Sequence, residues 1–198
     1  AIGLNAVTKR FFLKAIQDNP KLFEKKVGAS GRPTAFLNRY NVGSMANLIT
    51  NLVNIEGDDD NLFYEAGADT FHDYDLTRFL KPLTLEDCIS RRKIIYNTYN
   101  DCAKASNVFV FTFGLCEAFF DLDTERFLNI APDPRGARNR NINFRFTSYD
   151  ENYKFGCQII SDIKILRPDA QIILTVSPVP LDTTFTCNDI IVANSLAK

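Results

Sequence analysis

The residues with the clearest chemical potential follow the most apolar run of the chain. The run from Val108 to Phe113 contains one polar residue, Thr112, and predicts a strand buried on both faces of a parallel sheet. It ends at Gly114, where the backbone can turn, and Cys116 and Glu117 follow. In open α/β sheets, ligands bind just beyond the carboxyl ends of the strands. We therefore expect Gly114, Cys116 and Glu117 to face a binding site.

Each of these three residues also has a simpler interpretation. Gly114 is a structural turn that lets the next residues face the site. Glu117 either orients a catalytic group or binds substrate hydroxyls, or it caps a helix, and the sequence favours neither reading. A nucleophilic Cys116 needs a base and an electropositive setting. Because the sequence offers no evident partner, we favour a small buried residue at this position.

His72 is the only histidine of the chain, and so the only imidazole available as a catalytic base. The segment around it has little periodicity and several aromatic residues, which predicts irregular structure. We consider two roles for it: a catalytic residue that lines the pocket, and a loop histidine paired with Asp73 or Asp75. The second role is favoured.

Two further segments could supply oxyanion or substrate contacts. Ser44 is the expected N-cap of a helix with an apolar stripe, which places Asn41 and Gly43 at a helix N-terminus, where backbone N–H groups can hold an anion. The simpler interpretation is plain capping. Ser177 ends a second apolar run, but Pro178 follows it directly. A nucleophile elbow needs a Gly-flanked turn from strand to helix, so we expect Ser177 to form hydrogen bonds in the pocket wall.

The elements that must position these residues follow from periodicity and capping signals. Helices are predicted from Ala6 to Gln17, from Leu85 to Lys104 after Thr84, from Tyr149 to Leu166 after Ser148, and from about Asn188 onward. A second buried parallel strand is predicted from Ala170 to Ser177, a β-hairpin from the alternating stretches 126–130 and 142–147, and a short edge strand within 21–29. A helix followed by a buried strand is typical of an α/β fold.

Composition limits the classes of function. A chain of 198 residues with 45% hydrophobic and 24% charged residues fits one globular domain. A net charge of −1 argues against a nucleic-acid partner. No apolar run approaches the roughly 20 residues that span a bilayer, and no signal peptide is visible. The five widely spaced cysteines and single histidine argue against disulfides and against a metal site, so we expect reduced thiols, a cytoplasmic location and no cofactor.

Two segments carry a family resemblance. Thr112–Asp121 and Ile173–Phe185, the latter followed by Val192–Ser195, resemble the GSCFA domain family, which is related to the SGNH/GDSL hydrolases. Tyr40–Ser44 is similar to the aromatic-Gly-Asn region near the start of that family. The most specific part is Thr175-Val-Ser-Pro-Val-Pro-Leu181. The resemblance runs from about Tyr40 to Lys198.

The resemblance implies a flavodoxin-like three-layer α/β/α fold and a site that hydrolyses or transfers acyl groups, often in proteins tied to surface polysaccharide. In such relatives, a serine after the first strand attacks the ester carbonyl, and a Gly N–H and an Asn side chain help form the oxyanion hole. A late histidine, oriented by an aspartate three residues before it, acts as the base.

The chain departs from this pattern at three places. The Gly-Ser-Cys-Phe-Ala motif that supplies the serine is absent, and the late histidine would follow Lys198. Cys116 stands where related hydrolases have Asn, and a thiol is a weak donor. We therefore expect residues 1–198 to form one domain that is incomplete at both ends and lacks its first and last strands. Its nucleophile and base would lie outside the chain.

The leading hypothesis is an ester hydrolase or O-acyltransferase domain whose substrate is an acylated carbohydrate. The alternative is a non-catalytic glycan-binding domain of the same fold. A nucleotide-binding module is the weakest hypothesis, because no Gly-x-Gly-x-x-Gly or Walker-type loop is present.

Overall fold

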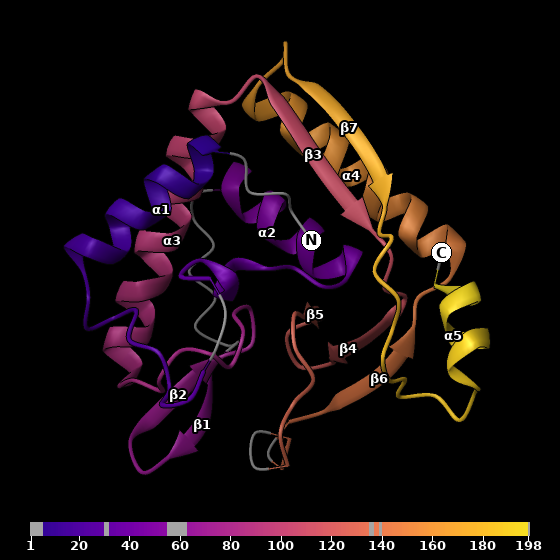
Figure 1. Cartoon of the computed structure of the whole chain (residues 1–198), viewed down its shortest axis with the longest axis horizontal. Helices are drawn as coiled ribbons and strands as arrows, with labels where there is room; N and C mark the ends of the chain where they lie inside the picture. Colours follow the sequence, from indigo (N-terminus) through magenta and orange to yellow (C-terminus); the bar gives the residue numbers. More distant parts are fainter. Residues whose placement is uncertain (1–5, 30–31, 55–62, 135–136, 139, 198) are drawn as a thin grey trace.

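A computed structural model describes residues 6–29, 32–54, 63–134, 137–138 and 140–197. The chain has a mixed α/β fold in which the described strands form a parallel pair, an antiparallel pair and an antiparallel sheet of three (Figure 1). The parallel pair and the three-stranded sheet lie beside the C-terminal helix, and the antiparallel pair lies at the opposite end of the molecule. The α/β class predicted from the sequence is therefore confirmed.

The parallel pair consists of β3 (Val108–Phe113) and β7 (Gln171–Val176). The two strands run in register from Val108 opposite Gln171 to Phe113 opposite Val176. Ser177 continues the pairing, since its N–H donates to the carbonyl oxygen of Phe113 at 2.6 Å. The carboxyl ends of both strands thus lie at one edge, as the sequence predicted.

The prediction that both strands are buried on both faces is wrong. Phe109, Phe111 and Phe113 belong to or pack against the main core, whereas Val110 and Ile173 are exposed. The physical reason is that helices pack on one face of this strand pair, so alternate side chains of β3 face solvent. In β7 only Ile172 is even partly buried.

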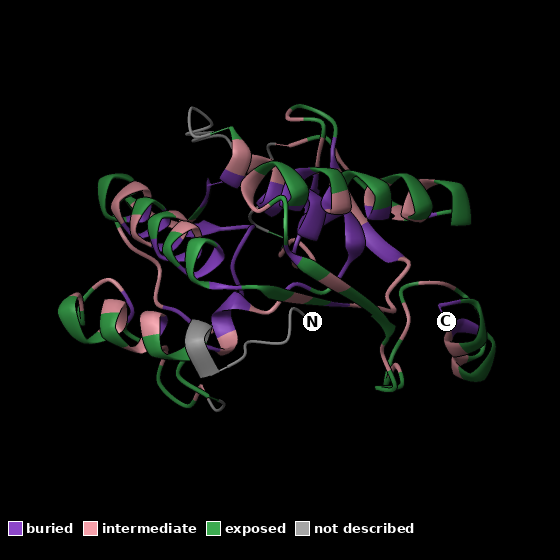
Figure 2. Ribbon diagram, turned by 90° about the horizontal axis from the view of Figure 1, so that it is seen from above, coloured by how far each residue is buried: buried purple, intermediate pink, exposed green. Residues whose placement is uncertain are grey.

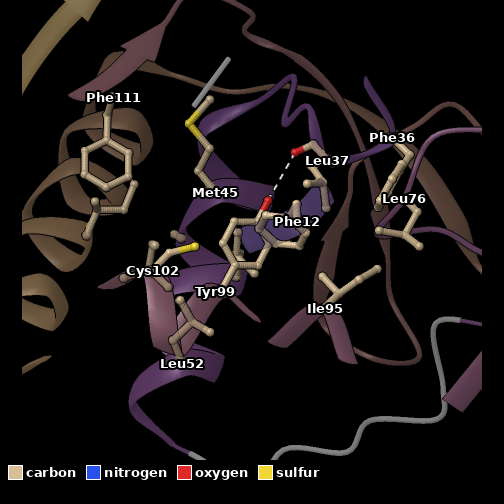
Figure 3. Close-up of a cluster of buried hydrophobic side chains, with 14 of the residues drawn as sticks. Phe12, Phe36, Leu37, Met45, Leu52, Leu76, Ile95, Tyr99, Cys102 and Phe111 are labelled. Carbon is tan, nitrogen blue, oxygen red and sulfur yellow. Dashed lines mark hydrogen bonds between the residues drawn. The ribbon is translucent and has the colours of Figure 1, made fainter. Parts of the chain in front are cut away.

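Four helices enclose the main core. They are α1 (Ala6–Asp18), α2 (Val42–Val53), α3 (Leu85–Ala105) and α4 (Tyr149–Leu166). Their buried sides face the middle of the molecule, where buried residues gather (Figure 2). In that core, the ring of Phe12 packs edge-on against Tyr99 with centroids 4.8 Å apart, and the Tyr99 hydroxyl donates to the carbonyl oxygen of Leu37 (Figure 3). Burial of such side chains from water is the main stabilising term of the fold.

Side-chain caps set the starts of α2, α3 and α4. Thr84 accepts a hydrogen bond from the N–H of Asp87, and Ser148 and Glu151 form a full capping box, so both predicted caps are confirmed. The predicted cap at Ser44 is wrong. Asn41 is the N-cap of α2, because its Oδ1 accepts from the N–H of Ser44 at 2.8 Å. A short last helix, α5 (Ile190–Leu196), begins after Asp189 as predicted.

The three-stranded sheet differs from the predicted hairpin. Its order is β5 (Arg126–Leu128), β4 (Glu117–Asp121) and β6 (Ile142–Phe146), all antiparallel. The two alternating stretches of the sequence are strands, but they do not pair with each other. Instead, both pair with the residues directly after the β3 turn, which form a strand of their own. This arrangement also excludes Glu117 as a helix cap.

The remaining strands form a hairpin where irregular structure was predicted. β1 (Phe63–Gly67) pairs with β2 (Thr70–Asp73) around a tight turn in which Asp69 has a positive φ of 53°. The edge strand predicted within 21–29 is wrong, because only an isolated bridge between Lys25 and Leu80 forms there. A short 3₁₀ helix, η1 (Ala35–Leu37), leads toward α2.

Candidate functional site

A pocket of about 300 Å³ lies at the carboxyl end of the parallel strand pair. Gly114 and Cys116 line it together with Val42 at the start of α2 and Val176 at the end of β7. We call it the Cys116 pocket. The rest of its wall comes from the β3 turn, the end of β6, the start of α4 and the end of α5: Phe113, Leu115, Phe146, Thr147, Ser148, Tyr149, Asn152, Leu196 and Ala197. A largely apolar hollow with a few convergent polar groups is typical of small-molecule sites.

The β3 turn is fixed against the sheet and the start of α4. Gly114 has a φ of 157°, which side-chain-bearing residues rarely adopt. The carbonyl oxygen of Cys116 accepts hydrogen bonds from the Thr147 N–H at 2.8 Å and from its hydroxyl at 3.0 Å. The β4–β6 pairing therefore continues one step further, and it brings the start of α4 to the pocket wall.

Asn152 occupies the pocket wall with its two polar atoms in different situations. Its Nδ2 donates to the hydroxyl of Thr147 at 3.0 Å and to the carbonyl oxygen of Ser148 at 2.9 Å. Its Oδ1 is buried and has no hydrogen-bond partner among the described residues. Reversing the amide would place the oxygen against that carbonyl oxygen, so the hydrogen bonds assign Oδ1 as the free acceptor.

The environment of Cys116 favours the protonated form of its thiol. Burial raises the pKa of the Cys116 thiol, outweighing hydrogen bonds with Thr147 and Asn152 that lower it. The Sγ atom lies 3.8 Å from Asn152 Nδ2 and 3.9 Å from the carbonyl oxygen of Leu196. A protonated thiol is a poor nucleophile, so this setting suits a small wall residue.

A second pocket, of about 250 Å³, adjoins the first across Leu115, which lines both. Glu117 and Asn41 contribute to this Glu117 pocket, whose other walls are Tyr40, Ala118, Phe119, Leu128, Asn129, Ile130, Ala131 and Phe185. Glu117 is buried, and both of its carboxylate oxygens have partners. One accepts from the Thr184 hydroxyl, and the other accepts from the Phe185 N–H at 2.7 Å. The carboxylate thus anchors the segment after β7.

The start of α2 is held by a buried amide network. Asn41 donates from Nδ2 to the carbonyl oxygen of Leu128 at 2.8 Å, while its Oδ1 caps the helix. Asn129 accepts from the Tyr40 N–H and from the Ser44 hydroxyl. Both polar ends of the Asn41 side chain are therefore engaged inside the protein, and its contribution to the pocket wall is one of shape.

Gly43 is a close-packing position. A Cβ atom built there would lie 2.4 Å from the ring of Phe127, which no side chain tolerates without movement. The lack of a side chain lets α2 approach β5 directly. Gly43 lines neither of the two pockets.

Ser177 also lines neither pocket. Its N–H extends the β3–β7 pairing, and its hydroxyl accepts from the N–H of Val179 at 3.2 Å. The side chain thus shapes the turn that leaves β7.

His72 lies on β2, among residues that line neither pocket. Its Nε2 is 2.9 Å from the Nζ of Lys26, and its ring packs on Tyr64. Burial, followed by the charges of Lys26 and Arg91, lowers the pKa of His72 to about 4. The imidazole is therefore neutral near neutral pH and accepts a hydrogen bond from the lysine.

Sequence reasoning thus found two residues of the Cys116 pocket. It located Gly114 and Cys116 but missed Thr147 and Asn152, which stand at a predicted junction of strand and helix. That junction was a usable signal, since both segments were recognised. The pairing of β6 with β4, which brings the junction to the β3 turn, has no local signature.

No cluster of three or more His, Cys, Asp or Glu side chains that could hold a metal ion occurs in the part of the chain that the structure describes. Within the same residues, no helix is long and apolar enough to cross a membrane.

Comparison with known proteins places the chain in a family. The model of the GSCFA family matches residues 12–198, so the chain belongs to the GSCFA family. No curated protein and no solved structure matches the chain.

Proposed function

We propose that the chain forms a single acyl-transfer domain with a flavodoxin-like, SGNH-type three-layer fold. In this proposal it is an ester hydrolase or O-acyltransferase that acts on acylated carbohydrate. The observation that carries the proposal is the Cys116 pocket, which lies at the carboxyl ends of two parallel strands and has Gly114 and Cys116 in its wall. Membership of the GSCFA family supports it, through the resemblance of that family to serine hydrolases.

In this proposal the chain's own residues bind and orient the substrate. The apolar side chains of the Cys116 pocket hold the acyl group and exclude water from it. The start of α2 borders the same pocket at Val42, and a helix N-terminus favours negative charge developing on the ester oxygen. The unpartnered Oδ1 of Asn152 is an acceptor buried in the pocket wall, so it does not suit an oxyanion.

The nucleophile and the base are proposed to lie outside the residues that the structure describes. The hydrogen bond of His72 is to Lys26 and not to a serine, and His72 lines neither pocket. Glu117 has a positioning role, because both of its oxygens hold the segment after β7.

The test uses the full-length protein, a fluorophosphonate probe and a p-nitrophenyl acyl ester. We expect covalent labelling of a serine and turnover of the ester. Asn152→Ala should raise KM for an acylated sugar about tenfold, because Asn152 Nδ2 holds the pocket wall at Thr147 and Ser148, with little change in kcat. Asn97→Ala, an exposed asparagine on α3, is the matched control and should leave both unchanged. Absence of both labelling and ester turnover would reject the proposed enzymatic activity.

A non-catalytic glycan-binding domain is the second candidate. It is favoured by the lining of the Cys116 pocket, which contains neither a charged side chain nor an imidazole among the described residues. A protein that binds saccharides without labelling or turnover would support this candidate over the first.

A further inference from the structure

A strongly exposed aromatic pair stands beside the Cys116 pocket. Tyr149 and Tyr153 are 80% and 62% exposed, and their rings stack with centroids 6.2 Å apart and planes inclined by 19°. They lie four residues apart on the first turns of α4, so both project from one face of the helix. Neighbouring aromatic side chains that are exposed to water beside a pocket can form a contact surface.

A third pocket, of about 250 Å³, lies beside the two tyrosines, and both line it. Tyr149, Tyr153, Gly156 and Leu174 line this Tyr153 pocket, and it shares Phe113, Tyr149 and Asn152 with the Cys116 pocket. The two hollows therefore have a common wall, in which Asn152 stands with its Oδ1 buried and without a partner among the described residues.

The chemistry of this surface selects a neutral ligand with both apolar and hydroxylated faces. No charged side chain lines either hollow in the described part of the chain, which disfavours phosphates and acidic sugars. A pyranose ring presents C–H groups on its flat faces, which pack on tyrosine rings, and hydroxyl groups at its rim, which stay in contact with water beside an exposed pair.

We propose that Tyr149 and Tyr153 form a platform for a neutral pyranose ring, with the adjoining Cys116 pocket receiving the group attached to it. The proposal rests on the proposed function for its choice of a carbohydrate. The backbone that carries the platform is held before binding, because the capping box of Ser148 and Glu151 fixes the start of α4 and Arg145 forms an ion pair with Glu151. A pre-formed surface loses little entropy when a ligand binds.

The test measures binding of unacylated neutral hexaoses to the full-length protein. Cellohexaose, xylohexaose and mannohexaose at about 5 mM are titrated by calorimetry and by saturation-transfer NMR, which suits weak binding. We expect at least one hexaose to bind. Tyr153→Ala should weaken that binding about tenfold through loss of ring stacking, and Tyr153→Phe should retain it because the ring remains. Ile165→Ala, at an exposed position of the same helix, is the matched control and should bind normally.

Two results would overturn the platform: no hexaose binds, or Tyr153→Ala binds as well as the unaltered protein. Thermal melts of each variant check that the fold is kept, which is expected because Tyr153 is exposed. These hexaoses carry no ester, so the outcome is independent of acyl transfer. Tyr153-dependent binding without ester turnover would reject the proposed enzymatic activity and support the tyrosine platform. Ester turnover without hexaose binding would support the enzymatic activity and reject the platform.

Discussion

The β1–β2 end of the molecule and the carboxyl end of the parallel strands differ in how their polar groups are used. At the β1–β2 end, charged groups are buried and paired: Asp73 with Arg92 at 2.7 Å and Asp75 with Arg39 at 3.2 Å. The only imidazole, His72, is bonded to a lysine there. At the strand ends, the pockets are mostly apolar, and the buried Asn152 Oδ1 has no partner among the described residues.

This difference shows that residue type alone is a poor guide to the site. The groups that most often perform catalysis gather where they stabilise the fold, because a buried charge must be paired. The Cys116 pocket instead contains residues of modest reactivity, which contribute its shape. The following experiments test whether the charged groups stabilise the fold while the pocket residues shape the site, from the largest expected effect to the smallest.

The largest effect is expected at the buried ion pairs. Asp75→Ala leaves the guanidinium of Arg39 buried without its partner and should lower the free energy of unfolding by about 3–5 kcal/mol, measured by urea titration. Burial disfavours the charged form of Asp75, but the nearby arginines outweigh it and lower its pKa. Glu24→Gln removes an exposed pair with Lys81 and should cost less than about 1 kcal/mol. Equal losses of unfolding free energy in the two variants would contradict the expected difference between buried and exposed ion pairs.

The second test concerns packing near the pockets. Gly43→Ala places a methyl group against the ring of Phe127 and should cost about 1–3 kcal/mol in unfolding free energy. Gly156→Ala is the matched helical control, since its Cβ would make an ordinary 3.7 Å contact with Phe113. It should be neutral or stabilise by up to about 1 kcal/mol. If both changes had the same effect, close packing would not be the reason for Gly43.

The third test uses pH to isolate His72. In the unfolded chain a histidine gains its proton below about pH 6.5. The folded protein resists protonation until about pH 4. The unfolded state therefore binds more protons between these values, and stability falls as the pH falls. Between about pH 7.5 and about pH 5, this loss should be about 1–2 kcal/mol smaller in His72→Gln than in the unaltered protein.

The same variant tests the catalytic assignment directly. His72→Gln should retain ester turnover, because its hydrogen bond is to Lys26 and it lines neither pocket. Loss of turnover in a variant that still folds would restore His72 as a catalytic residue.

The smallest effect is a difference in thiol reactivity. Cys116 is half-buried with a raised pKa, whereas Cys157 is exposed. Alkylation by iodoacetamide near neutral pH, followed by mass spectrometry, should be about tenfold slower at Cys116. Faster labelling of Cys116 would indicate a reactive thiolate in the pocket.

Much of the framework was predictable, because its signals are local. The caps at Thr84 and Ser148, the parallel alignment of β3 with β7, and the placement of Gly114 and Cys116 at the strand ends all followed from sequence. Strand β4 did not, because its five residues become a strand only by pairing with segments that follow it along the chain. The exposure of β7 is likewise a property of which helices pack on it, and not of its own side chains.

The contact between Glu117 and Phe185 has a consequence for how the molecule opens. One carboxylate joins the first residue of β4 to a segment that follows β7, although the two are far apart in sequence. The Phe185 amide hydrogen can exchange with solvent only when this link breaks. Its exchange rate therefore reports the opening of the wall of the Glu117 pocket separately from global unfolding.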